Sequence, residues 1–380
     1  MLPARHPRLR VLSVFGTRPE AIKMAPVIRE LARHPDVASA VCVTGQHREL
    51  LDEVLETFAI EPQHDLDVMR VGQSPTGVAA AVLQRLEPVL AEVRPDWVLV
   101  QGDTTTAAVA AMAAFYGGAR VAHVEAGLRS YEPREPFPEE INRRIAGVVA
   151  DMHFAPTVRA RDNLLAEGTD PDAVVVTGNT VIDALRQATP ALPAGLPGRG
   201  RLVLVTAHRR ESFGRPLQQV CAAVRELVAA RPDVHVVFPV HPNPAVRMAA
   251  EELLAGIERV SLLPPVGYRQ MVGLLHRCAL VLTDSGGLQE EAPSLGKPVL
   301  VLRDVTERQE AVEAGAAVLV GTDAGRIVAT AGALLDSPSR YAAMSRAGNP
   351  YGDGRAAERI VASLRGEPVA EWAPLAAEAA

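Results

Sequence analysis

The chain has 380 residues, of which 48 % are hydrophobic and 22 % charged, and its formal net charge is −6. This is the composition of a globular protein with enough chain for two ordinary domains. The sequence has neither the run of about 20 apolar residues that spans a membrane nor a basic block suited to a nucleic acid or an anionic lipid surface. Its three cysteines form no CxxC pair, so they indicate neither a disulfide framework nor a zinc site.

The first apolar run, Val11–Phe15, is too short for the core of a secretion signal, so we expect a cytoplasmic protein. From there, short apolar runs alternate with longer amphipathic patterns such as Ala25–Arg33, Thr76–Val93 and Pro216–Ala230. Continuous apolar runs predict strands of a parallel sheet that helices cover on both faces. The further strands predicted in this way are Ala40–Thr44, Trp97–Gln101, Arg120–Val124, Met152–Ala155, Val174–Thr177, Leu202–Thr206, Val234–Phe238, Val260–Leu263, Leu280–Thr283, Val299–Leu302 and Ala317–Val320.

A proline-rich stretch without periodicity, Ala188–Gly200, separates two equal groups of these strands. We therefore predict the α/β class, with two Rossmann-like domains facing a central cleft. The N-terminal domain is expected to cover residues 1–178 and the C-terminal domain residues 179–362. A C-terminal helix at about residues 363–380 is expected to pack back on the first domain.

Ligands of open parallel sheets bind beyond the carboxyl ends of the strands, so the residues that follow each strand are informative. The first strand leads into Gly16-Thr17-Arg18, where Pro19 favours the first turn of a helix. Arg18 would then lie at the helix entrance with Lys23 about one turn further on, and both could hold negative charge. After Leu280–Thr283, the segment Asp284-Ser285-Gly286-Gly287 opens a helix whose free N–H groups could cradle a phosphate.

Three further polar residues follow predicted strands. Asp103 could serve a site or could be an N-cap. Glu125 could serve a site or belong to a structural ion pair, because a half-buried carboxylate needs a partner. His208 is followed by two arginines and a glutamate at a strand end, which favours a functional role.

Other candidates have equally simple structural explanations. Glu139 and Glu140 could be the acidic first turn of a helix, where they complement its dipole. His241 lies between prolines and could fill a turn, and His123 lies inside a predicted strand, where we expect a core residue.

The sequence lacks the GxGxxG and GxxxxGK[ST] motifs of dinucleotide and P-loop sites, and the HExxH and CxxC motifs of metal sites. What remains is a set of phosphate-binding elements together with carboxylates and a histidine. This combination favours an anionic diphosphate ligand and proton-transfer chemistry.

The motifs FGTRPEAIKMAP, TGQH, GDTTT, HVEAGLRS, PFPEEINRR, TAHRRES, HPNP, TDSGGLQEEAPSLGKPVL, RDVTERQE and NPYGDG closely resemble, in order, those of the bacterial UDP-N-acetylglucosamine 2-epimerases. The resemblance covers about Val11 to Leu364 and implies a GT-B fold whose C-terminal domain binds UDP. It also implies reversible conversion of UDP-N-acetylglucosamine to UDP-N-acetylmannosamine without a cofactor or metal. In that family the C2 proton leaves, UDP departs from C1, and 2-acetamidoglucal stays bound until UDP adds back.

By the same resemblance, Asp103, Glu125 and Glu139 supply the carboxylates near C2, and His208 lies near the leaving diphosphate. Which carboxylate serves which face of C2 stays open. The residues that would hold the UDP-sugar are Arg18, Lys23, Ser285, Gly286, Gly287, Glu291 and Arg308.

The non-hydrolysing bacterial branch of this family has a second, regulatory site for UDP-N-acetylglucosamine, and its members are often homodimers. We favour this branch because its regulatory residues are present as Gln46, His47, Arg210, Glu211 and His241.

The sequence departs from the family around Val266–Met271, where a glutamine and an aromatic residue usually lie near the uracil. The alternatives are a hydrolysing 2-epimerase that releases UDP and N-acetylmannosamine, a 2-epimerase of another UDP-sugar, a GT-B glycosyltransferase, and a UDP-sugar sensor without turnover.

Overall fold

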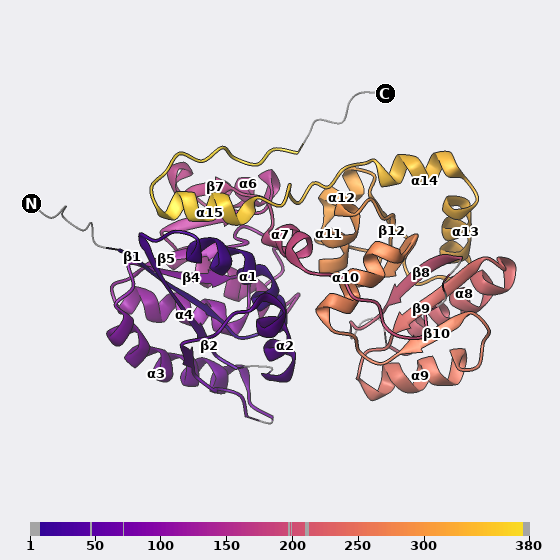
Figure 1. Ribbon diagram of the computed structural model, residues 1–380, viewed down its shortest axis with the longest axis horizontal. Helices are drawn as coiled ribbons and strands as arrows, with labels where there is room; N and C mark the ends of the chain where they lie inside the picture. Colours follow the sequence, from indigo (N-terminus) through magenta and orange to yellow (C-terminus); the bar gives the residue numbers. More distant parts are fainter. Residues whose placement is uncertain are drawn as a thin grey trace, which may run out of the picture. The chain divides into compact units, whose positions relative to one another are not determined.

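The computed structural model describes residues 8–45, 48–70, 72–196, 198, 200–209 and 213–374. The chain forms two compact units, each with its own parallel sheet (Figure 1). Unit 1 comprises Met1–Gln187 and Tyr351–Ala373, and unit 2 comprises Ala188–Pro350 and Pro374–Ala380. No helix in the described ranges is both long and apolar enough to cross a membrane. The two α/β units are those of the GT-B architecture.

In the described part of unit 1, seven strands form a sheet in the order β3-β2-β1-β4-β5-β6-β7. The strands are β1 (Leu9–Phe15), β2 (Val37–Val43), β3 (His64–Asp65), β4 (Trp97–Gln101), β5 (Arg120–Val124), β6 (Met152–Ala155) and β7 (Val174–Val176). The helices are α1 (Arg18–Ala32), α2 (Arg48–Phe58), α3 (Pro75–Val93), α4 (Thr105–Tyr116), α5 (Glu139–Val149), α6 (Val158–Ala166), the 3-10 turn η1 (Pro171–Ala173), α7 (Thr180–Gln187) and α15 (Ala356–Leu364).

In the described part of unit 2, six strands form a sheet in the order β10-β9-β8-β11-β12-β13. The strands are β8 (Arg201–Thr206), β9 (Val234–Pro239), β10 (Val260–Leu263), β11 (Leu280–Thr283), β12 (Val299–Val301) and β13 (Ala317–Leu319). The helices are α8 (Arg215–Ala230), α9 (Pro244–Leu254), α10 (Tyr268–Arg277), α11 (Gly286–Ser294), α12 (Gln309–Glu313), α13 (Ala324–Leu335) and α14 (Pro338–Ser345).

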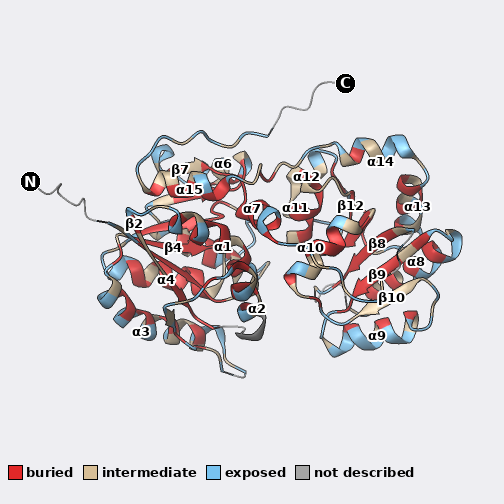
Figure 2. Ribbon diagram, in the orientation of Figure 1, coloured by how far each residue is buried: buried red, intermediate tan, exposed pale blue. Residues whose placement is uncertain are grey.

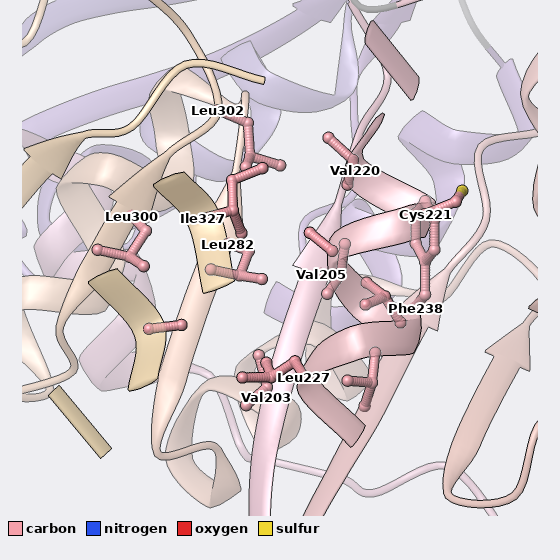
Figure 3. Close-up of a cluster of buried hydrophobic side chains, with 14 of the residues drawn as sticks. Val203, Val205, Val220, Cys221, Leu227, Phe238, Leu282, Leu300, Leu302 and Ile327 are labelled. Atoms are coloured by element: carbon pink, nitrogen blue, oxygen red, sulfur yellow. The ribbon is translucent and has the colours of Figure 1, made fainter. Parts of the chain in front are cut away.

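The strands predicted from apolar runs are all present, and both sheets are buried beneath helices (Figure 2). One observed strand, β3, was not predicted, because its two residues, His64 and Asp65, carry no apolar pattern. Figure 3 shows the core of unit 2, a buried cluster that includes Val205 and Leu282 of the sheet and Val220 of α8. Each such fully buried side chain contributes about 1.5–3 kcal/mol relative to an exposed one, and this burial holds the helices on the sheet.

The end of the chain returns to unit 1. Asp183 of α7 accepts the N–H groups of Ala356 at 3.2 Å and Ala357 at 2.9 Å, which caps the start of α15. Further on, Glu371 accepts the N–H of Val176 at 3.1 Å, so the extended segment lies along β7. These bonds keep α7 and α15 in one unit.

The observed division of the chain differs from the one drawn from the sequence. The sequence placed the boundary after residue 178 and the returning helix at about residues 363–380. In the structure the division falls after Gln187, and the chain returns to unit 1 from Tyr351 onward. The helix that packs on unit 1 is α15, and the described residues after Leu364 form no further helix. The apolar pattern of a helix does not identify the sheet that it covers, so the bounds of the returning segment could not be read from it.

Candidate active site

The strand order of both sheets reverses beside one strand. β1 lies between β2 and β4, and β8 lies between β9 and β11. The loops that leave the carboxyl ends of such neighbouring strands diverge and open a crevice for a ligand. The loops after these strands carry residues that the sequence singled out. They are Arg18 and Asp103 in unit 1, and His208 and Ser285 in unit 2.

A buried glutamate joins the loops after β1 and β4. The Glu20 carboxylate accepts the N–H groups of Gly16 at 3.1 Å and Thr17 at 2.7 Å, and the hydroxyl of Thr104 at 2.7 Å. Its burial raises the pKa of Glu20. Thr17 is the N-cap of α1, so Arg18 is the first helical residue, which confirms its predicted place at the helix entrance.

Glu125, the residue after β5, is a buried carboxylate on a strained backbone. Its φ of 63° lies in the left-handed region, and the residue is 8 % exposed. Its Oε1 accepts hydrogen bonds from Lys23 Nζ at 2.5 Å and Asn179 Nδ2 at 2.9 Å, and its Oε2 accepts one from Gln101 Nε2 at 2.5 Å. The ion pair that offered a structural explanation of Glu125 is therefore present, and its cation is the lysine expected to bind a diphosphate.

Gln101 and Asn179 were not singled out from the sequence. Gln101 is a polar residue at the end of the otherwise apolar β4, and this was the one signal available for it. Asn179 lies in a short Gly-Asn stretch that reads as an ordinary turn, and only the structure brings it to Glu125.

Asp103 lies in an ion-pair network on the carboxyl edge of unit 1. Its Oδ2 is 2.7 Å from Nη2 and 3.0 Å from Nε of Arg143, and Arg143 Nη1 is 2.9 Å from Oε2 of Glu140. Asn142 also donates to the carbonyl of Asp103 at 2.9 Å. One face of α5 thereby holds the Asp103 loop, while the Asp103 side chain stays 29 % exposed.

The two glutamates of the FPEE motif have different surroundings. Glu140 is fully buried, pairs with Arg143, and accepts the N–H groups of Ser130 at 3.0 Å and Tyr131 at 3.2 Å. Burial alone would raise its pKa, but these donors and Arg143 lower the pKa of Glu140 below its ordinary value. Glu139 differs, because its buried Oε2 has no hydrogen-bond partner among the described residues.

His123 is a core residue, as the sequence predicted. It is 1 % exposed, and its Nε2 lies 2.7 Å from the carbonyl of Gly102, to which it can only donate. Burial lowers the pKa of His123 to about 4, so the ring is neutral. It supports the backbone turn that precedes Asp103.

In unit 2, the loops after β8 and β11 meet through His208 and Asp284. His208 Nδ1 is 2.9 Å from Oδ1 of the fully buried Asp284, and the His208 side chain is 42 % exposed. The His208 ring also stacks on that of His241, with 6.1 Å between centroids. His241 Nδ1 accepts the N–H of Asn243 at 3.2 Å, so the turn role weighed for His241 is present as well.

The predicted phosphate cradle lies at the start of α11, which begins at Gly286 with Ser285 as N-cap. A Cβ at Gly286 would lie 3.1 Å from the guanidinium carbon of Arg308, so glycine gives this arginine room against the helix start. Arg308 Nε is 2.9 Å from Oε1 of Glu290. The residues that the structure brings together here are Ser285, Gly286, Gly287, Glu291 and Arg308.

Two groups of residues from the sequence analysis remain. Gln46, His47, Arg210 and Glu211 lie outside the described residues. In the segment that departs from the family, Val266 is buried and Met271 is half-buried near the start of α10.

Comparison with known proteins identifies the family. Residues 29–365 match the family model described as UDP-N-acetylglucosamine 2-epimerase. A putative UDP-N-acetylglucosamine 2-epimerase of Thermotoga maritima is 52 % identical over 364 residues, which cover 94 % of this chain and 96 % of the relative. The UDP-N-acetylglucosamine 2-epimerase of Yersinia pestis is 50 % identical over 374 residues, covering 95 % and 100 %.

A solved structure agrees with these relatives. The UDP-GlcNAc 2-epimerase from Neisseria meningitidis, bound to UDP-GlcNAc, superposes with a TM-score of 0.88 at 45 % identity, covering 94 % of this chain and all of that one. The chain belongs to the UDP-N-acetylglucosamine 2-epimerase family. The family resemblance read from the sequence motifs is therefore confirmed.

One carboxylate next to the cradle makes the stability of unit 2 depend on pH. Glu307 lies 2.8 Å from Arg303, 3.6 Å from Arg209 and 3.9 Å from Arg308. Burial alone would raise its pKa, but the three guanidinium groups lower the pKa of Glu307 to about 2. Because the pKa falls on folding, the stabilisation is complete above the ordinary value of 4.5 and is lost as the pH drops toward 2.

We expect Glu307→Gln to flatten this part of the pH dependence. The free energy of unfolding from urea titrations should fall less steeply between pH 4.5 and 2 in the variant than in the wild type. The exposed Glu226 offers a control, because Glu226→Gln should keep the wild-type slope. Equal slopes for Glu307→Gln and the wild type would show that the ion pairs do not stabilise unit 2.

Proposed function

We propose that this protein interconverts UDP-N-acetylglucosamine and UDP-N-acetylmannosamine without net hydrolysis. The observation that carries the proposal is the family match over residues 29–365, joined to carboxylates held on the carboxyl edge of unit 1. Oε2 of Glu125 lies 3.5 Å from the position of a Cβ on Gly102, so Glu125 lies against the residue before Asp103. These are groups that proton transfer at a sugar carbon requires.

The proposed reaction is an elimination followed by its reverse. A carboxylate takes the C2 proton, the C2–H electron pair forms the C1=C2 double bond, and the C1–O bond breaks with its electrons on UDP. The 2-acetamidoglucal stays bound. UDP then attacks C1 while an acid protonates C2 on the opposite face, which inverts that carbon.

The carboxylates Asp103, Glu125 and Glu139 are the proposed acids and bases. The surroundings of the three carboxylates differ. Asp103 and Glu125 are paired with cations, whereas Glu139 has a buried oxygen without a partner among the described residues. A buried carboxylate oxygen without a partner is costly in stability, which supports a functional role for Glu139.

The proposed UDP site combines a helix N-terminus with cations. The start of α11 supplies N–H groups and a positive dipole end, and Arg308 lies against it. Arg18 and Lys23 would meet the diphosphate from unit 1, and Glu291 would accept the ribose hydroxyls. In this proposal Lys23 exchanges Glu125 for a phosphate oxygen, and His208 stabilises the charge that develops on the leaving diphosphate.

We also propose that UDP-N-acetylglucosamine activates the enzyme from a second position, as in the non-hydrolysing branch. The stacking of His241 on His208 supports this proposal, because a ligand that contacts His241 would act one ring away from the leaving group.

A homodimer is the proposed assembly, and unit 1 offers a surface for a second copy. Phe115 and Tyr116 at the end of α4 are 58 % and 73 % exposed, and Val148 on the neighbouring α5 is 84 % exposed. Exposed apolar side chains on two packed helices suit a self-complementary interface. Sedimentation velocity should give about twice the chain mass of 40.4 kDa, and a monomer would contradict the proposal.

The first test is proton NMR of UDP-N-acetylglucosamine incubated with the protein in D₂O. We expect UDP-N-acetylmannosamine with deuterium at C2, because the proton removed exchanges with solvent before it returns. Free N-acetylmannosamine with UDP would instead identify a hydrolysing 2-epimerase. No change in the spectrum, with binding confirmed by calorimetry, would refute turnover of this sugar.

Asp103→Asn and Glu139→Gln should each lower kcat by about 10²- to 10⁴-fold, the range lost with a general acid or base. Glu139→Gln should keep the wild-type melting temperature, because its carboxylate has an oxygen without a partner among the described residues. Glu140→Gln is the matched contrast and should lower the melting temperature, since Arg143 loses a buried partner. Wild-type rates for both Asp103→Asn and Glu139→Gln would remove the proposed acids and bases.

Activation is best measured in the reverse direction, from UDP-N-acetylmannosamine, with and without added UDP-N-acetylglucosamine. The wild type should show a lag that the added nucleotide sugar removes. His241→Ala should lose this response while it still binds UDP. An unchanged response in His241→Ala would show that His241 has only a structural role, in the turn that it forms with Asn243.

A further inference from the structure

Asp284 is a fully buried carboxylate that follows β11, and its position in the sequence indicated no role except as the start of the phosphate cradle. Its Oδ2 accepts the N–H groups of His208 at 2.9 Å and Arg209 at 3.0 Å. Its Oδ1 lies 2.9 Å from His208 Nδ1. One carboxylate therefore meets both the backbone and the ring of the same histidine.

The parallel register explains why these groups meet. Thr206, the last residue of β8, is paired with Thr283, the last residue of β11, and their hydroxyls lie 2.6 Å apart. The residues that follow these two strands leave the sheet side by side, so Asp284 faces the loop that carries His208. A hydrogen bond from the N–H of Ser285 to Thr283 Oγ1 at 2.9 Å fixes the start of the cradle next to it.

We propose that Asp284 is a positioning residue that holds His208 with a proton on Nδ1 and turns Nε2 toward the diphosphate. The inference rests on the proposed function of His208. The 2.9 Å separation of Oδ1 from Nδ1 is a close ion-pair contact and not an aligned hydrogen bond in the structure. An ionised carboxylate only accepts hydrogen bonds, so we expect the ring nitrogen that faces it to carry the hydrogen. The other nitrogen is then directed away from the buried carboxylate, on a side chain that is 42 % exposed.

The charge of Asp284 supports this role. Burial alone would raise its pKa, but His208 and the two N–H donors lower the pKa of Asp284 to about 2, so it is ionised at neutral pH. A fixed negative charge beside Nδ1 keeps a hydrogen on that nitrogen, so Nε2 is the ring atom left to meet a phosphate oxygen. The other titratable ring on this side is His241, stacked 6.1 Å away.

A purely structural role would be different. As a cap for two N–H groups, Asp284 would act on the loop whether or not residue 208 is a histidine. Asp284→Asn separates the two roles, because Oδ1 of asparagine can still accept the N–H groups while its NH₂ group presents a donor to the ring. The same change at Asp183, which accepts two N–H groups and has no imidazole partner among the described residues, is a matched control.

The kinetic test is a double-mutant cycle of Asp284→Asn and His208→Gln in the D₂O assay. Asp284→Asn alone should lower kcat by about 10- to 100-fold, the usual loss for a group that orients a functional histidine. In the His208→Gln background it should cost less than about 2-fold more. We expect the losses of kcat from Asp183→Asn and His208→Gln to multiply in the double variant. The same result for Asp284→Asn with His208→Gln would overturn the positioning role.

A second measurement does not depend on turnover. In protein with ¹⁵N-labelled histidine, the wild-type spectrum should show His208 protonated at Nδ1, assigned by its disappearance in His208→Gln. Asp284→Asn should move the hydrogen to Nε2, and Asp183→Asn should not. A wild-type ring with hydrogen only on Nε2 would overturn the proposal even if Asp284→Asn fails to fold. Absence of epimerisation with the expected spectrum would refute only the proposed function.

Discussion

Buried carboxylates that accept pairs of backbone N–H groups hold the loops of both units. Glu20 does this after β1, Glu140 before α5, and Asp284 after β8. A loop at a sheet edge has few hydrogen bonds of its own, and a charge buried without donors would be expelled. The loop N–H groups and the buried carboxylates satisfy one another. The loops that carry Arg18 and His208 therefore have defined backbones without regular structure.

The same carboxylates set the electrostatics of the site. The donors around Glu140 and Asp284 lower the pKa of each and keep both ionised, whereas Glu139 has a buried oxygen without such support in the described chain. A site of this kind separates charges that hold the scaffold from charges that can change during a reaction. The adjacent glutamates of α5 show the division within one turn of helix.

Much of this fold follows from the sequence, because buried parallel strands are continuous apolar runs and strand-end residues gather at one edge. The same rule placed Arg18, Asp103, Glu125 and His208 near ligand-binding edges. It could not pair Lys23 with Glu125, distinguish Glu139 from Glu140, or find Gln101. Those facts depend on which side chains meet after packing, and neighbouring positions in sequence carry no record of that.

The return of the chain end to unit 1 has a consequence for biosynthesis. Residues Tyr351–Ala373 complete a unit whose other residues are made first, and α15 and Glu371 supply bonds to α7 and β7. A ribosome therefore finishes the first unit only after it has made the second. Until then Asp183 lacks its two N–H donors, and Asn179, which holds Glu125, lacks the carbonyl of Tyr351 to which its backbone N–H donates at 2.6 Å. Unit 1 thus reaches its final form only after most of unit 2 has been synthesised.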